Sequence, residues 1–270
     1  MEITFIGGGN MAAALMGGMI AKGFPAQSVK VVELLHEARA RLSEQFGVQV
    51  FERVEDAAPF GDLAVLAVKP QQMREAALEA GRHVGTTPVL SVAAGIRLAD
   101  LARWLGGRPT LARCMPNTPA LIGLGITGLY AEPRVPAEAR RAMQSLLEAV
   151  GKVVWVEEES LLDPVTAVSA SGPAYFFYFI EALEQAGREM GLTPETARAL
   201  AIETARGAGE LAARSSEPPS LLRERVTSKG GTTERALATM NADGVQAAIV
   251  RALKAANARA GELGEEFGRQ

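Results

Sequence analysis

The chemistry that this sequence can support begins with Gly7, Gly9 and Ala12, which follow the Gly-x-Gly-x-x-Gly/Ala spacing inside ITFIGGGNMAAAL. The first glycine permits a tight turn, the second lets a pyrophosphate approach the backbone, and the small third residue lets a helix pack on a strand. Free N–H groups at the N-terminus of that helix attract the phosphate charge. The motif therefore predicts a dinucleotide site, with a tight turn that binds no ligand as the alternative. We assign to this site Ile6, Gly7, Gly9, Asn10 and Met11.

A carboxylate at Glu33 follows the second predicted strand, about 20 residues beyond the glycines. An acidic side chain there binds the ribose 2′-hydroxyl of NAD and repels the 2′-phosphate of NADP. Arg39 and Arg41 lie further along the following helix and could instead serve a phosphate. The sequence therefore predicts NADP or NAD as the cofactor, with a slight preference for NADH.

Two further strand ends are expected at the same edge of the sheet. AVLAVKP includes Lys69, which either faces the cofactor or is an ordinary exposed lysine at a strand end. SVAAG has small residues where a nicotinamide ring needs room. We add Ala67, Val68, Lys69, Pro70, Ala93 and Ala94 to the predicted cofactor site, and we assign no metal ligand.

A second glycine turn, in SKGGTTERAL, is expected to open a helix. Gly230, Gly231 and Thr232 would expose backbone N–H groups at a positive helix end, which suits a substrate carboxylate. The alternative is an ordinary glycine turn with a threonine cap. Glu224 is the nearest candidate carboxylate to this turn, although a solvated helix face accounts for it equally well.

Asn117 and Ser171 are further candidates for the site. The two prolines of MPNTP fix the backbone, so Asn117 either points its amide into a cleft or satisfies the turn itself. Ser171 precedes a long helix and is predicted to line the same cleft. His36 and His83 lie outside every motif and are expected at the solvated surface, whereas Cys114 is expected to pack as a small hydrophobic side chain.

The composition is that of a soluble globular protein. The chain has 270 residues, of which 48% are hydrophobic and 22% charged. A net charge of −3 without a basic cluster argues against a nucleic-acid partner. Glycines and Asn10 interrupt the apolar N-terminal segment, which argues against a membrane span or a secretory leader. The single cysteine excludes an internal disulfide and suits a reducing compartment, so we expect a cytoplasmic protein.

The first part of the chain alternates short apolar strands with amphipathic helices. Strands are predicted at 3–6, 29–32, 63–68, 89–92, 111–113, 126–130 and 153–156, and helices at 37–46, 71–80, 98–105 and 136–150. Near-continuous apolar strands indicate a sheet that is covered on both faces by crossover helices. We therefore predict an α/β fold with an N-terminal Rossmann-like, doubly wound and mostly parallel sheet, over residues 1–157.

The rest of the chain, residues 158–270, predicts an all-α domain. Helices are expected over 173–190, from Pro194, from about Thr232 and from Asp243, with a loop at 214–219. The first of these helices is apolar on nearly all sides and therefore needs cover on all sides. Either it is the central helix of its domain or a second subunit covers part of it, and we slightly favour the second subunit.

Three further stretches carry a family resemblance. They are RCMPNTPALIGLG (113–125), SASGPAYFFYFIEAL (169–183) and PSLLRERVTSKGGTTERALATM (219–240). Together with GGGNMA they resemble the pyrroline-5-carboxylate reductases over essentially the whole chain, and the pairing of GGTT with MPNTP is the most specific element. Two departures are Lys229, where the family usually has proline, and Ala170, where a glycine is common.

The resemblance implies reduction of 1-pyrroline-5-carboxylate to L-proline, the last step of proline biosynthesis, by hydride transfer from NADPH or NADH. It implies that Thr233 is the catalytic residue, with its hydroxyl on the substrate nitrogen. It also implies that the helical domain intertwines in a dimer, from which larger rings are built. No histidine is needed if the enzyme selects an imine that is already protonated.

Three rival functions remain open from the sequence. The first is a reductase of another cyclic imine. The second is a 3-hydroxyacid dehydrogenase, which commonly uses a helical lysine as its base, but residues 153–228 contain no lysine. The third is a dinucleotide-binding regulatory protein, in which GGTT and MPNTP would have no role.

Overall fold

The computed structural model describes residues 1–107 and 109–269, which divide into two compact units. The first unit comprises Met1–Ser171 and the chain from Ala256 onward, and the second comprises Gly172–Ala255. These boundaries differ from the predicted domains, 1–157 and 158–270, which stay a prediction.

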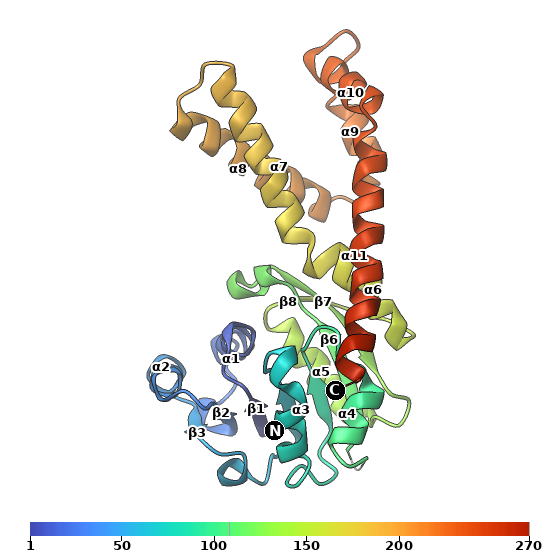
Figure 1. Ribbon diagram of the computed structural model, residues 1–270. Helices are drawn as coiled ribbons and strands as arrows, with labels where there is room; N and C mark the ends of the chain where they lie inside the picture. Colours follow the sequence, from blue (N-terminus) through green and yellow to red (C-terminus); the bar gives the residue numbers. More distant parts are fainter. Residues whose placement is uncertain (108, 270) are drawn as a thin grey trace. The chain divides into compact units, whose positions relative to one another are not determined.

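The first unit is built on an eight-stranded sheet with the order β3-β2-β1-β4-β5-β6-β7-β8 (Figure 1). The strands are β1 Ile3–Ile6, β2 Val29–Val32, β3 Gln49–Phe51, β4 Leu63–Leu66, β5 Val89–Ser91, β6 Leu111–Met115, β7 Gly125–Ala131 and β8 Gly151–Trp155. After β3 the chain crosses to the other side of β1, so the connections leaving β1 and β4 diverge. Ligands bind at such a switch point, outside the carboxyl ends of the strands.

Every strand pair is parallel except β6 and β7, which are antiparallel. Residues 116–124 join these two strands and form only a short 3-10 turn, Thr118–Ile122. A parallel crossover needs a longer connection, so the chain reverses direction here. The predicted Rossmann-like, mostly parallel α/β sheet is confirmed.

Helices cover both faces of the sheet. They are α1 Asn10–Ala21, α2 His36–Phe46, α3 Met73–Ala80, α4 Leu98–Trp104, α5 Ala137–Glu148 and α6 Leu162–Val165, followed by a π-helical turn, Thr166–Ala170. One core contains buried side chains of α1, α2 and α5, and the other contains those of α3 and α4 together with Phe267 near the chain end. This is the arrangement expected of a doubly wound sheet.

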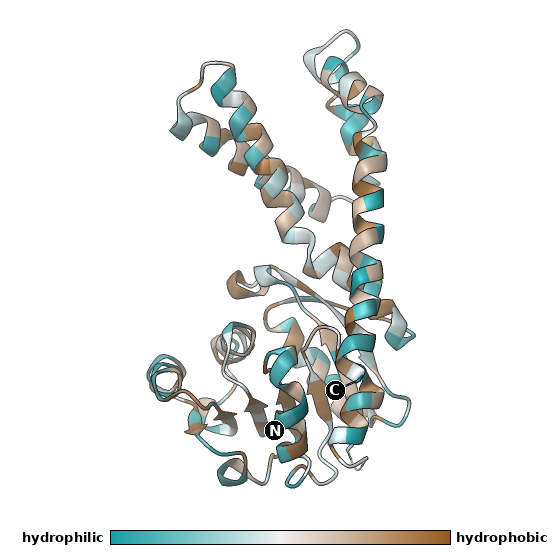
Figure 2. Cartoon of the chain, viewed as in Figure 1, coloured by the Kyte–Doolittle hydropathy of each residue, from teal (hydrophilic) through white to brown (hydrophobic). Residues whose placement is uncertain are grey.

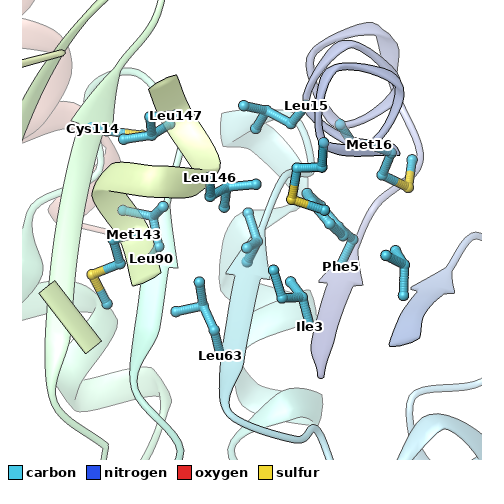
Figure 3. Close-up of a cluster of buried hydrophobic side chains, with 14 of the residues drawn as sticks. Ile3, Phe5, Leu15, Met16, Leu63, Leu90, Cys114, Met143, Leu146 and Leu147 are labelled. Carbon is cyan, nitrogen blue, oxygen red and sulfur yellow. The ribbon is translucent and has the colours of Figure 1, made fainter. Parts of the chain in front are cut away.

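Figure 3 shows the first of these cores, where Leu15 and Met16 of α1 lie beside Ile3 and Phe5 of β1. All four side chains are buried. Burying one such side chain contributes about 1.5–3 kcal/mol, so this layer holds the strand and helix on either side of the glycine turn in a fixed relation. In Figure 2 the arrows of β1 and β2 are mostly brown, which is the apolar pattern from which these two strands were predicted.

The second unit contains only helices among its described residues. They are α7 Gly172–Glu189, α8 Pro194–Arg214, α9 Pro219–Arg225, α10 Thr232–Ala242 and the first part of α11 Val245–Gly268. Helices α7 and α8 pack closely, because a Cβ on Gly187 would lie 3.1 Å from the Cβ of Ala197. Over the described part of the chain, no helix is long and apolar enough to cross a membrane.

Strand β3 and helices α6 and α9 were not predicted from the sequence, and α6 has only four residues. Strand β3 has only three residues and lies at the edge of the sheet, so its pattern is too short to distinguish from a loop. Helix α9 begins at Pro219, which is the second residue of a Pro-Pro pair and suits the first turn of a helix. The sequence pattern predicts a loop up to this proline and no helix after it.

Candidate functional site

The turn from β1 to α1 depends on the backbone freedom of Gly7. Its φ is +101°, and a Cβ there would lie 2.7 Å from the carbonyl oxygen of Ala67. The N–H of Gly7 donates to the carbonyl oxygen of Val32 at 2.8 Å. The first glycine of the motif is therefore required by the packing of the protein itself.

Gly9, the second glycine of the motif, is not confined by neighbouring atoms. Its φ is −69°, which any residue can adopt, and no described atom lies within 4 Å of a Cβ built on it. The packing of the chain therefore does not explain a glycine here. Open space beside the backbone is what a pyrophosphate requires at the second glycine of the fingerprint.

The N-terminus of α1 is free to bind an anion. Gly9 is its N-cap, no described side chain caps it, and its first turn contains no acidic residue. The aligned peptide dipoles and unpaired N–H groups of the first turn therefore face outward with a partial positive charge. Ala12 is fully buried, as the third position of the motif requires. The residues present fit a dinucleotide.

Glu33 reaches back from the end of β2 to the glycine turn. Its Oε2 accepts a hydrogen bond from the N–H of Gly8 at 2.9 Å, and its Oε1 accepts one from the N–H of Leu35 at 3.0 Å. The side chain is half-buried. A carboxylate is thus held next to the loop where the fingerprint expects the ribose.

The other predicted cofactor residues follow the same edge of the sheet. Ile6, Leu66 and Ser91 are register partners across β1, β4 and β5, so the stretches that follow them emerge side by side. Of the predicted residues, Ile6 and Ala93 are buried, Met11, Ala67, Val68, Pro70 and Ala94 are half-buried, and Asn10 and Lys69 are exposed. The structure therefore brings the predicted cofactor residues together at one edge, and their roles stay a prediction.

Asn117 lies at the carboxyl end of β6 and bonds to backbone on two sides. Its Oδ1 accepts from the N–H of Ile126 at 3.0 Å, and its Nδ2 donates to the carbonyl oxygen of Ser169 at 3.3 Å. The side chain is 9% exposed. This geometry supports the alternative in which Asn117 satisfies the loop. Ser171, half-buried at the end of the π-helical turn, follows the stretch that Asn117 holds.

A buried arginine network beneath β6 was missed by the sequence analysis. Nη1 of Arg113, 1% exposed, lies 2.5 Å from Oε1 of Glu159, which also accepts from the N–H of Leu98 at 2.8 Å. Arg97 pairs with Asp163 at 2.6 Å. Burial lowers the pKa of Arg113, and the charge of Glu159 opposes this effect. An arginine inside an otherwise apolar strand was the available signal for this network.

The second glycine turn lies before α10, in the second unit. Gly230 has a φ of +73°, and its N–H donates to Oε2 of Glu234 at 2.6 Å. The N–H of Gly231 donates to the carbonyl oxygen of Ser228 at 3.0 Å. Both glycine N–H groups therefore already have partners within the turn. Gly231 is the N-cap of α10, which no described side chain caps.

Thr232 is exposed and Thr233 is half-buried in the first turn of α10. Glu224 is exposed on α9. With Arg223, Thr227, Leu237 and Asn241 it lines an open hollow of about 180 Å³. The predicted substrate residues are thus divided: Asn117 and Ser171 belong to the first unit, and Glu224 with the 230–233 turn belongs to the second.

The remaining predictions concern residues outside the site. Cys114 is buried, and burial raises the pKa of its thiol, so it packs as predicted and is not an activated nucleophile. His36 is exposed as predicted, whereas His83 is half-buried.

Two family models match parts of the chain. Residues 2–95 match the family described as NADP oxidoreductase coenzyme F420-dependent. Residues 159–263 match the family described as pyrroline-5-carboxylate reductase dimerisation.

Individual proteins match the whole chain. A pyrroline-5-carboxylate reductase from Pseudomonas aeruginosa is 43% identical and covers 99% of this chain and 98% of its own. The solved structure of such a reductase from Coxiella burnetii has a TM-score of 0.92 at 37% identity, covering 97% of this chain and 98% of its own. That from Plasmodium falciparum, solved with NADP bound, has a TM-score of 0.85 at 24% identity over 97% and 98% of the two chains, and this likeness shows the fold alone.

Proposed function

We infer that this chain, which belongs to the pyrroline-5-carboxylate reductase family, reduces 1-pyrroline-5-carboxylate to L-proline with NADPH or NADH, the last step of proline biosynthesis. The observation that carries this conclusion is 43% identity over nearly the full length of a relative of that name. The glycine turn at α1 supports it independently, because its open side at Gly9 fits a dinucleotide.

We propose that the first unit holds the cofactor. The N–H groups at the start of α1 bind the pyrophosphate, and the small residues Ala93 and Ala94 leave room at the end of β5 for the nicotinamide ring. When bound, the cofactor supplies the hydride that adds to the carbon of the C=N bond. The first unit therefore contributes orientation, which is a large part of such a catalyst's effect.

For the second unit we propose that the turn before α10 binds the substrate carboxylate. The backbone N–H groups of Thr232 and Thr233 lie in the first turn of this helix, where the dipole favours a negative charge. Gly230 and Gly231 shape the turn, and the N–H of Gly230 becomes available only when Glu234 moves away from it. Thr233 then orients the substrate nitrogen through its hydroxyl, and the reaction uses an imine that is already protonated.

Self-association is part of the function, since residues 159–263 match a dimerisation family. We propose an intertwined dimer, from which a ring of dimers can form, in the cytoplasm. Four consecutive aromatic residues of α7, Phe176 to Phe179, are 48–76% exposed in the single chain, and a second copy would cover them. Light scattering coupled to size exclusion gives the assembly size.

The reaction is tested by following the nicotinamide absorbance with 1-pyrroline-5-carboxylate, with NADPH and NADH in parallel and with proline quantified. We expect cofactor oxidation that matches proline formation mole for mole. Folded protein that oxidises neither cofactor would contradict the proposal. Six-membered cyclic imines and 3-hydroxyacids would then be the next substrates to test.

A further inference from the structure

The carboxylate of Glu33 is held in place before any ligand arrives. The N–H groups of Gly8 and Leu35 each donate to one of its two oxygens, at 2.9 and 3.0 Å. A carboxylate accepts about four hydrogen bonds, so each oxygen keeps a lone pair for a further donor. A ribose hydroxyl is such a donor, whereas a phosphate dianion only accepts.

Arg39, one of the two cations that could serve a 2′-phosphate, is engaged elsewhere. Its Nη1 donates to the carbonyl oxygens of Glu33 and Leu34, both at 2.7 Å. Its Nη2 forms an ion pair with Glu52 at 2.7 Å, and the side chain is only 14% exposed. The guanidinium thus holds the end of β2 in place, and its charge is paired with that of Glu52.

The two residues that follow Glu33 form an exposed apolar surface. Leu34 and Leu35 are 72% and 68% exposed, which is unusual for leucines directly after a buried strand. Leu35 also lines an open hollow of about 720 Å³, with His36, Glu37, Ala38 and Arg41. Exposed apolar side chains suit the face of an adenine ring, and the acidic Glu37 offsets Arg41 in the lining.

We propose that Glu33 makes this chain prefer NADH over NADPH, by accepting the hydroxyls of the adenosine ribose and repelling a 2′-phosphate. The proposal rests on the proposed function only in that a nicotinamide dinucleotide binds at the β1–α1 turn. It goes further by assigning the choice between the two cofactors to one side chain and its fixed geometry.

The test is the dissociation constant of NAD⁺ and of NADP⁺, measured by titration calorimetry without substrate. We expect the wild-type chain to bind NAD⁺ at least about tenfold more tightly, because a like charge close to the 2′-phosphate opposes NADP⁺ binding; tenfold corresponds to about 1.4 kcal/mol. Glu33→Gln should narrow this ratio at least about fivefold, mainly through tighter NADP⁺ binding. Glu44→Gln, the same charge change on an exposed residue in the last turn of α2, should leave the ratio unchanged.

The possible results distinguish a failure of this inference from a failure of the proposed function. Equal or tighter binding of NADP⁺ to the wild-type chain overturns the inference, and loss of that binding in Arg41→Ala would identify Arg41 as the determinant instead. A ratio that Glu33→Gln leaves unchanged, including an equal loss of both affinities, also overturns it. Failure of the folded wild-type chain to bind either dinucleotide counts against the proposed function itself. If the Glu33→Gln protein does not fold, the wild-type ratio still tests the preference for NAD⁺.

Discussion

The two glycine turns of this chain each open a helix, yet the structure holds them differently. Gly7 lies between β1 and β4, where backbone atoms of Ala67 leave no room for a Cβ. Gly230 lies on an exposed loop, and no described atom lies within 4 Å of a Cβ built there. The first turn is confined by the core, whereas the second is held by two local hydrogen bonds, from Gly230 to Glu234 and from Gly231 to Ser228.

This difference suits the two ligands that we assign to the turns. A cofactor cradle gains from being preorganised, because no binding energy is then spent on ordering it. In the second turn, the exposed carboxylate of Glu234 can be exchanged for the carboxylate of a substrate. The comparison therefore predicts that substitutions in the first turn affect cofactor binding, and that substitutions in the second turn affect turnover.

The largest effect is expected from Gly9→Val. The new side chain has no described neighbour in the protein, so the chain should still fold, and the poorer N-cap should cost only about 1 kcal/mol of stability. It fills the space that a pyrophosphate needs, and dinucleotide affinity should fall at least about 100-fold. Titration calorimetry and a thermal melt measure the two quantities. Unimpaired binding would remove the α1 turn from the cofactor site.

Thr233→Ala should have the next largest effect and should leave the cofactor site untouched. Loss of a hydroxyl that hydrogen-bonds to a charged imine costs about 1.5–3 kcal/mol, so kcat should fall about 10- to 100-fold. Dinucleotide affinity should match that of the wild-type chain. Thr239→Ala, which removes a hydroxyl from the same helix, serves as the control. Unchanged turnover in Thr233→Ala would exclude this residue from the mechanism.

The smallest expected effect is a difference in the free energy of unfolding between two matched alanine variants. Gly7→Ala and Gly230→Ala both place a Cβ on a residue with positive φ, which costs about 1–2 kcal/mol. Gly7→Ala must also push its Cβ against the carbonyl of Ala67, so it should lower the free energy of unfolding by at least about 1 kcal/mol more. Urea denaturation measures both. Equal losses would show that the core does not confine the first turn.

The glycine fingerprint, the alternating elements and the carboxylate at Glu33 were readable from the sequence because they depend on local spacing. Asn117 was not, since the choice between cleft and backbone depends on Ile126 and Ser169, which are distant along the chain. The ion pair of Arg113 with Glu159 was missed for the same reason. Strand β3 and helix α9 were missed because short elements carry too few residues for periodicity to show.

By itself the sequence determined the α/β class, the position of the dinucleotide turn and, through its motifs, the family. These follow from hydrophobic periodicity and from glycines at set intervals, which act over a few neighbouring residues. Only the tertiary structure decided that Gly7 is confined whereas Gly9 is open, and that Arg39 is engaged behind Glu33. Those properties arise where segments far apart in the chain come into contact, and local spacing carries no information about such contacts.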